Sequence, residues 1–481
     1  MSDSSFLCSS VSRRRALQTV ACGFGQLALT GLAQQTTAAT GSPQNPLAAR
    51  VTHHPARAKR IIFLFMAGGV SHVDSFDHKP LLDQHDGAMR EFDDARTLAK
   101  TGKIVQHRVM KPLWRFRQHG ECGRWASELF PHMAEHVDDL CVIRSMHTEG
   151  VAHGPATLFL HTGSTNLIRP SVGAWVSYGL GTESQNLPAF VSICPAIANG
   201  GPRNFGSAFL PPVYQGTAIG RAGIPTREAQ VRNLSNVRLS LAEQRERFDL
   251  IRSLNTEQIA QHSGDGELQA VLDSFELGFR MQNHAPEVFD LNRESKETLA
   301  MYGIDQKPTD DFGRQCLMAR RLAESGVRYI QVNYADNSAN PAWDQHSNMP
   351  KHADHAKAVD QPVAALLTDL KQRGLLEDTL VWWGGEFGRT PYAEKNGTGR
   401  DHNPGGFTIW LAGGGVKPGF AYGETDDWGH HAVLDKVHMH DLHATALHLL
   451  GMDHERLTHN YAGRNFRLTD VAGRVVHDIL A

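Results

Sequence analysis

Short apolar runs alternate with helical patterns along most of this 481-residue chain. The clearest run, from Arg60 to Met66, is unbroken and leads to Gly68-Gly69, as expected of a central strand in a parallel sheet. This alternation predicts an α/β fold with a mostly parallel central sheet covered by helices on both faces. Further strands are expected at 140–144, 190–193, 327–332, 379–383 and 407–411, and helices at 125–136, 155–161, 172–178, 239–261, 267–282, 312–324, 356–372 and 441–450.

The chain divides into a leader and one large domain. Residues 1–40 contain Ser12-Arg13-Arg14-Arg15-Ala16-Leu17-Gln18, which fits the twin-arginine (Tat) export signal, and the apolar stretch after it is too weak to span a bilayer stably. An amphipathic helix start is the alternative. We expect Tat export to the periplasm or another extracytoplasmic space. Residues 41–481 then form a single domain, with a loop and helical insertion at about 199–290.

The net charge of the chain does not point to a strongly charged binding partner. The formal net charge is −3 and charged residues make up 21% of the chain, so neither nucleic acid nor an anionic membrane surface is indicated. Histidines are unevenly distributed, since eight of the 27 lie between His430 and His459. Imidazole and carboxylate groups together suit a divalent metal such as Zn, Ca, Mg or Mn. Chance clustering of packed or solvated histidines is the alternative.

Residues directly after each strand are the first candidates for a site, because ligands bind outside the carboxyl ends of parallel strands. Asp74 and Asp77 follow the first strand as candidate metal ligands, although a capped helix start explains them equally well. His153 is expected at a helix N-terminus, where free N–H groups attract an anionic oxygen. Nearby Ser145 and Thr148 suit capping better than nucleophilic attack.

The C-terminal half supplies the remaining candidates. Asp344 and His346 lie two apart on a loop and can share a metal, whereas His352 and His355 are expected to face solvent. Glu386, after a strongly apolar strand and between glycines, is a candidate ligand, and Arg389 is suited to clamp a tetrahedral oxyanion. Asp401, His402 and His440 complete the expected metal-ligand set.

Three long motifs resemble one family. They are Phe-Met-Ala-Gly-Gly-x-Ser-His-x-Asp-x-Phe-Asp-x-Lys-Pro from Phe65, Gly-Gly-Glu-Phe-Gly-Arg-Thr-Pro from Gly384, and His-Asp-Leu-His-Ala-Thr-x-Leu-His-Leu-Leu-Gly from His440. Together they are similar to a group of exported bacterial proteins known as domain of unknown function 1501, over essentially the whole mature chain. The resemblance implies an alkaline-phosphatase-like fold distantly related to sulfatases, without implying a reaction.

The chemistry departs from the sulfatase pattern that this resemblance brings in. Gly68-Gly69 stands where sulfatases carry an Asp-Asp pair, and Glu386-Phe387 stands where they carry Asp-His. The nucleophile motif Cys/Ser-x-Pro-Ser-Arg is replaced by a segment that begins at His153 and reads His-Gly-Pro-Ala-Thr. A formylglycine nucleophile cannot form at a histidine, so the usual sulfatase reaction is not expected.

Two interpretations follow. In the first, a divalent cation held by shifted ligands activates water for attack on a sulfate or phosphate ester of a small molecule or polysaccharide, with His153 or His346 protonating the leaving group. In the second, catalysis is lost and the protein binds a sulfated or phosphorylated polysaccharide or an exported partner. The enzyme interpretation predicts that Asp74 or Asp77, Glu386, His402 and His440 converge within about 5 Å. A non-haem iron oxygenase also needs two histidines and a carboxylate, but its usual β-barrel setting does not fit.

Overall fold

A nine-stranded sheet forms the centre of the computed structural model, which describes residues 46–481 apart from 232–233, 235, 237, 262–265 and 395–396. The expected leader at residues 1–40 lies outside the described residues. Across the sheet the strands are β14 (Phe420–Tyr422), β6 (Leu140–His147), β13 (Phe407–Ala412), β10 (Thr379–Gly384), β1 (Arg60–Met66), β9 (Tyr329–Tyr334), β7 (Phe190–Ile193) and β8 (Thr217–Ile219), with β17 (Val437–His438) paired to β6.

Most strand pairs of this sheet are parallel. Strand β1 pairs parallel to both β10 and β9, and β7 pairs parallel to both β9 and β8. Strand β13 is the exception, because it runs antiparallel to its neighbours β10 and β6. All seven residues of β1 are buried, which explains why its sequence is an apolar run without alternation.

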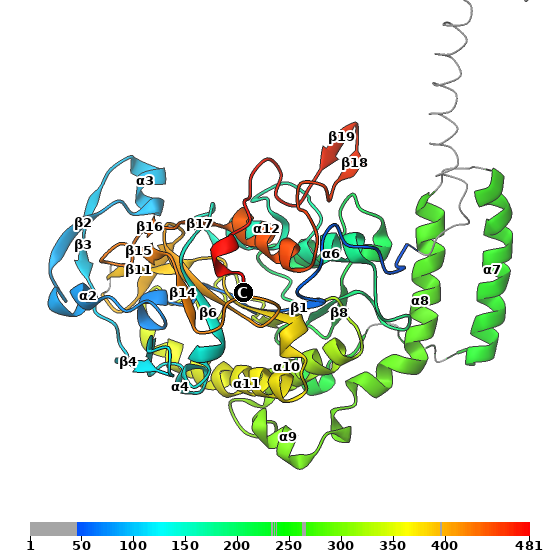
Figure 1. The fold of residues 1–481 in the computed structure, drawn as a ribbon, viewed down its shortest axis with the longest axis horizontal. Helices are drawn as coiled ribbons and strands as arrows, with labels where there is room; N and C mark the ends of the chain where they lie inside the picture. The colour runs from blue at the N-terminus through cyan, green and yellow to red at the C-terminus, as the bar shows by residue number, and fades with distance from the viewer. Residues whose placement is uncertain (1–45, 232–233, 235, 237, 262–265, 395–396) are drawn as a thin grey trace, which may run out of the picture. The chain divides into compact units, whose positions relative to one another are not determined.

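Helices cover both faces of the sheet. Figure 1 shows α10 (Asp310–Glu324) and α11 (His352–Gln372) on one face, and α6 (Val172–Leu180) and α12 (Met439–Leu449) on the other. The predicted fold class is therefore confirmed. The remaining α-helices of the described residues are α2 (Pro80–Gln84), α3 (Ala95–Thr101), α4 (Pro131–Ala134), α5 (His153–Thr162), α7 (Leu241–Gln261), α8 (Gly266–Phe289) and α9 (Lys296–Met301).

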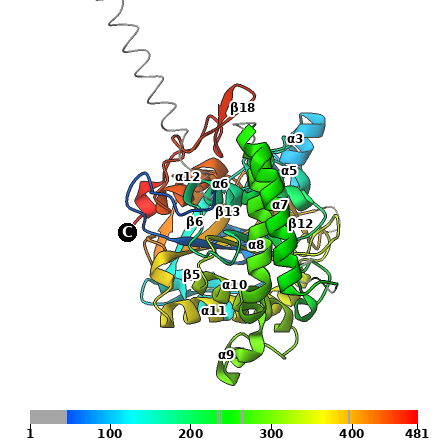
Figure 2. The same cartoon turned by 90° about the vertical axis from the view of Figure 1, so that its right-hand side faces the viewer.

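The segment expected to be an insertion is only partly peripheral. Helices α7 and α8 lie side by side in both views, at one end of the sheet (Figures 1 and 2). The stretch before them, however, contributes β8 to the sheet itself. The helix expected over residues 125–136 is wrong, because Arg124–Ser127 forms strand β5 against β4 (Phe116–His119), and only Pro131–Ala134 is α-helical.

A second, four-stranded sheet borders the carboxyl ends of the central strands. Its order is β12 (Arg400–Asn403), β11 (Gly388–Ala393), β3 (Val105–Val109) and β2 (Met89–Phe92). Strands β11 and β12 pair antiparallel, with Arg389 opposite His402. Short hairpins are formed by β15 (Glu424–Thr425) with β16 (Ala432–Leu434), and by β18 (His459–Tyr461) with β19 (Arg464–Phe466). Among the residues described, no helix is both long and apolar enough to cross a membrane.

Candidate metal centre

Four side chains from distant parts of the chain meet at the carboxyl ends of the central strands. His153 is the first residue of α5, Asp344 and His346 lie on the loop after β9, and His402 lies on β12. One donor atom from each lies within 4.8 Å of the others. Three imidazoles and a carboxylate at this spacing are a donor set that first-row divalent metals accept.

The closest donor atoms belong to Asp344, His346 and His402. Asp344 Oδ1 lies 2.9 Å from His346 Nε2 and 3.2 Å from His402 Nε2, and the two Nε2 atoms are 3.0 Å apart. A tetrahedral ion with metal–nitrogen distances of 2.0–2.1 Å holds its ligand atoms about 3.3 Å apart. The three atoms therefore stand close to the separations that one shared ion requires.

In His346 and His402, the hydrogen bond made by Nδ1 fixes which ring nitrogen faces the cluster. His402 Nδ1 donates to the carbonyl oxygen of Val151 at 2.8 Å, and His346 Nδ1 donates to Glu394 Oε2 at 2.5 Å. In the neutral rings both Nε2 atoms therefore carry lone pairs directed at the same point. Two such lone pairs repel unless a proton or a metal ion lies between them, and a metal ion fits the arrangement.

His153 lies between two carboxylates. Its Nδ1 is 2.6 Å from Glu386 Oε1, and its Nε2 is 3.2 Å from Asp344 Oδ2 without the alignment of a hydrogen bond. Glu386 is held in place by the N–H of Gly68, at 3.0 and 3.1 Å from its two oxygens. Gly68 has φ +114°, and a Cβ there would lie 2.7 Å from Asp344 N. The glycine thus allows the first strand's loop to approach the site closely.

Arg389 is entirely buried behind the cluster. Its Nε donates to Gly69 O at 3.0 Å, its Nη1 to Arg400 O at 3.2 Å, and its Nη2 to Gly68 O and to Asp344 Oδ1, the latter at 2.8 Å. Each guanidinium nitrogen thus has a protein acceptor. Arg389 fixes the orientation of Asp344 and does not present a free fork to an oxyanion, contrary to the role expected from the sequence.

The local charges at this point are mixed, because the Asp344 and Glu386 carboxylates are accompanied by the Arg389 guanidinium as well as the three imidazoles. Burial opposes ionisation of Asp344, but contacts with His153, His346 and His402 hold its pKa well below the usual range. Burial likewise disfavours charged His153, yet Asp344 and Glu386 raise its pKa. For His346, Asp344 outweighs burial and also raises the pKa. Burial lowers the pKa of His402 to about 4, so this ring is a neutral donor at pH 7.

Besides Asp401 and Glu386, of which Glu386 contacts the cluster only through His153, three residues expected as ligands lie outside it. Asp74 is fully buried and pairs with Arg400 at 2.8 Å. Asp77 lies 3.3 Å from Lys79 Nζ and accepts a hydrogen bond from Thr425. His440, on α12, has its Nε2 atom 3.0 Å from Gly163 O. Their partners are protein groups, and none of the three belongs to a potential metal-binding group in the described part of the chain. The predicted set therefore does not converge as a whole.

Asp401 is adjacent to the cluster. Its Oδ1 lies 3.6 Å from His346 Nδ1 and accepts a bond from Arg96 Nη1 at 2.6 Å. Glu394, which also contacts His346, was not predicted, because its place depends on the hairpin of β11 and β12, for which the sequence shows little alternation. His352, expected to face solvent, is instead fully buried and accepts a bond from the Ser71 N–H.

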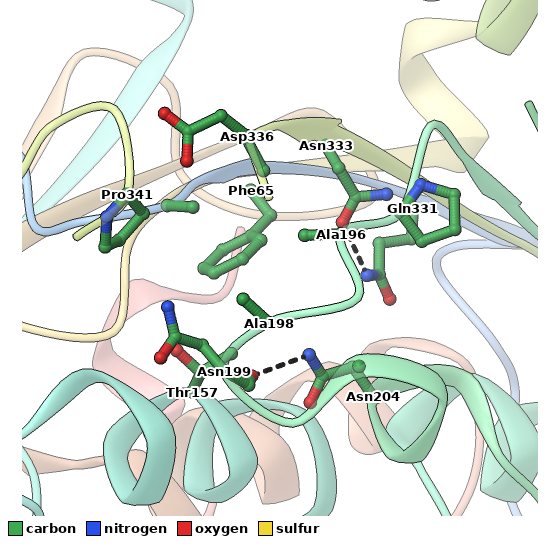
Figure 3. Close-up of a pocket in the computed structure, with 14 residues that line it drawn as sticks. Phe65, Thr157, Ala196, Ala198, Asn199, Asn204, Gln331, Asn333, Asp336 and Pro341 are labelled. Carbon is green, nitrogen blue, oxygen red and sulfur yellow. Dashed lines mark hydrogen bonds between the residues drawn. The ribbon is translucent and has the colours of Figure 1, made fainter. Parts of the chain in front are cut away.

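A small cavity adjoins the site near the ends of β1 and β9. It measures about 20 Å³, room for a single water molecule and not for a sugar. Figure 3 shows the amide of Gln331 donating to Asn333, and that of Asn204 donating to Asn199. The other atoms of these amides, Gln331 Oε1 and Asn204 Oδ1, have no hydrogen-bond partner among the described residues. Of the four cluster residues, His346 is the most exposed, with 27% of its side chain accessible.

Glu394→Gln is expected to weaken metal binding about 10–100-fold, because a carboxylate behind a ligating imidazole fixes its orientation and raises its basicity. The Zn²⁺ dissociation constant, measured by competition with a chelating dye, checks this. Glu424→Gln, which removes the carboxylate of a surface pair with Arg144, is the matched control and should bind like the wild type. Equal affinity in Glu394→Gln and the control would show that His346 is not a ligand.

Comparison with known proteins gives a family and distant structural likenesses. The family model described as "Protein of unknown function (DUF1501)" matches residues 58–480. No curated protein matches the chain significantly. Distantly similar solved structures are also found. They include the lipoteichoic acid synthase LtaP from Listeria monocytogenes (7% identity, 88% of this chain and 79% of that one, TM-score 0.36), the sulfatase PsFucS1 from Pseudoalteromonas sp. (12%, 83% and 69%, 0.34) and a protein in the alkaline phosphatase superfamily from Vibrio parahaemolyticus (10%, 86% and 72%, 0.35).

Proposed function

We propose a function for this chain, which belongs to the DUF1501 family: it is an exported, metal-dependent hydrolase of sulfate or phosphate esters that does not use the sulfatase nucleophile. The observation that carries the proposal is the convergence of Asp344, His346 and His402 with both Nε2 lone pairs directed at one point. Export rests on the twin-arginine pattern at residues 12–18, outside the described residues.

We assign a different role to each group of residues in the site. Asp344, His346 and His402 would hold the cation, while Glu394 and Arg389 orient His346 and Asp344. When bound, a divalent cation supplies polarisation of the ester and activation of water. His153 holds a proton between Glu386 and Asp344 and is placed to deliver it to the leaving oxygen. We assign proton delivery to His153 because both nitrogens of His346 are used, Nε2 by the cation and Nδ1 by Glu394, whereas His153 Nε2 has no hydrogen-bond partner among the described residues.

The test is hydrolysis of 4-nitrophenyl sulfate, 4-nitrophenyl phosphate and a sulfated polysaccharide by the full-length protein. We expect turnover with at least one ester, loss of turnover after chelation, and recovery with a divalent cation. His153→Gln should lower kcat about 10²–10⁴-fold, the range for loss of a general acid, while leaving bound metal in place. His355→Gln, at a histidine outside the cluster, is the matched control.

A binding protein without catalysis is the second candidate function. It is favoured by the engagement of Asp74, Asp77 and His440 elsewhere in the fold, since the enzyme interpretation of the sequence needed them in the site. Metal-loaded protein that hydrolyses none of the esters but is retained on an immobilised sulfated polysaccharide would support this candidate and overturn the first. The ligand class, a sulfated or phosphorylated small molecule or polysaccharide, is the same in both.

A further inference from the structure

A second group of donor atoms lies at the edge of the four-stranded sheet. Asp93, directly after β2, faces His430 and His431 on the loop between β15 and β16. Its Oδ1 is 3.1 Å from His430 Nε2 and 2.7 Å from His431 Nε2. The three atoms lie within 4.8 Å of one another, and none of their residues belongs to the first cluster. Two neighbouring imidazoles thus direct the same ring atom at one carboxylate oxygen.

The loop that carries the two histidines is tightly held. The Asp426 carboxylate accepts hydrogen bonds from the backbone N–H groups of Trp428, His430 and His431, at 2.8–3.0 Å. The Asp426 N–H in turn donates to His431 O at 2.8 Å. These bonds place both imidazoles on the same side of the loop without using any of the three donor atoms. The donor set is therefore positioned in advance.

The two rings differ in exposure, which makes one of them an anchor. His430 is 5% exposed and packs against the rings of Phe92 and Tyr392. The side chains of His431 and Asp93 are 42% and 45% exposed, and they border an open recess of about 590 Å³. An ion bound here would keep part of its coordination sphere open to water from the recess.

We propose that Asp93 Oδ1, His430 Nε2 and His431 Nε2 form a second site for a divalent transition metal, of which Zn²⁺ is the probe of choice. Two imidazole nitrogens favour Zn²⁺ and its first-row neighbours over Ca²⁺ and Mg²⁺, which take oxygen ligands. Three protein ligands and water complete a four-coordinate sphere. The site is independent of the proposed hydrolytic function.

Occupancy of this site would brace the four-stranded sheet, which carries His402 of the first cluster. Asp93 belongs to the edge formed by β2, whereas Asn403 at the end of β12 donates through Nδ2 to His430 O at 2.9 Å. The ion would therefore link the end of β2 to the loop that carries His430 and His431. That loop is already hydrogen-bonded to Asn403, the residue after His402. Because an ion that binds only the folded state stabilises it by mass action, Zn²⁺ should raise the unfolding temperature through this site.

The experiment measures Zn²⁺ stoichiometry in the full-length protein by equilibrium dialysis and elemental analysis, with the first cluster disabled by His402→Ala. In that background we expect one bound Zn²⁺ per chain, lost in Asp93→Asn and in His431→Gln. His85→Gln removes a histidine that packs on Trp428 beside the same recess and is the matched control, with binding retained. Because Asp93 and His431 are half-exposed, both variants should fold, which thermal unfolding without metal verifies.

Two further measurements distinguish this site from the first cluster. Co²⁺ should give ligand-field absorption bands in the His402→Ala background that vanish with Asp93→Asn, and Zn²⁺ should raise the unfolding temperature only when Asp93 is intact. Absence of Zn²⁺ binding in the His402→Ala background, or binding unchanged by Asp93→Asn, overturns the proposal whatever the first cluster does. If the first cluster binds no metal, wild type and His402→Ala will bind the same single ion, and Asp93→Asn will still remove it.

Discussion

His402→Ala is expected to weaken divalent-cation binding at the first cluster by at least about 100-fold, the upper limit found for loss of a mere supporting group. The reason is geometric. His402 is buried, its Nδ1–H is fixed on Val151 O, and its Nε2 lies 3.0 Å from His346 Nε2 and 3.2 Å from Asp344 Oδ1. Alanine leaves Asp344 and His346 as the two protein donors where the site offered three.

Metal content after export or native purification measures this effect, and a chelator competition gives the fold-change. His355→Ala serves as the control, since that ring is bonded to the Tyr334 hydroxyl and lies outside the donor groups. Retention of the Asp93 site in the variant would be seen as one remaining ion per chain. Equal stoichiometry and affinity in His402→Ala and the control would exclude the first cluster as the metal centre.

Asp74→Ala is expected to lower the free energy of unfolding by about 3–5 kcal/mol, the cost of removing one partner from a buried ion pair. Asp74 and Arg400 both have fully buried side chains and are 2.8 Å apart. Asp74 also accepts from Ser71 Oγ at 2.5 Å and from the Leu113 N–H at 2.9 Å. The variant leaves the buried Arg400 guanidinium without its ion-pair partner.

Urea unfolding followed by fluorescence and circular dichroism measures this loss. Glu128→Ala removes the carboxylate of an exposed pair with Arg117 and should change stability by less than about 1 kcal/mol. Metal affinity measured below the unfolding transition should be the same in Asp74→Ala as in the wild type. A loss of bound metal at unchanged stability would instead restore Asp74 to the role of ligand that the sequence suggested.

The central sheet could be predicted because its strands are buried on both sides. Residues 60–66 read as an uninterrupted apolar run, and β1 has the predicted bounds, as does β7. The second sheet was missed for the opposite reason. Strands β2 and β3 are short and are not fully buried, and β3 depends on pairing with β11, far along the chain, and not on a local pattern.

The sequence predicted the kind of site, a metal centre, but not the full set of residues that form it. Asp344, His346 and His402 were identified because strand ends and adjacent loops gather polar residues at one edge of the sheet. The same reasoning placed Asp74 and Asp77 there, although Arg400 and Lys79 pair with them instead. The choice depends on which cation approaches each carboxylate. The pairing of β11 with β12 brings Arg389 to Asp344 and Arg400 to Asp74, whereas Lys79 lies only two residues after Asp77.

By itself, the sequence of this protein determined six strands of the central sheet, a helix beginning close to His153 and the family motifs, because burial leaves local patterns. The short strands β8, β14 and β17 were not predicted. Only the tertiary structure decided that His346 and His402 share one point with Asp344, that Arg389 is a buried support, and that Asp93 meets His430 and His431. Donor sets of this kind join residues tens to hundreds of positions apart, so their distances depend on loop paths and strand register that no local pattern encodes.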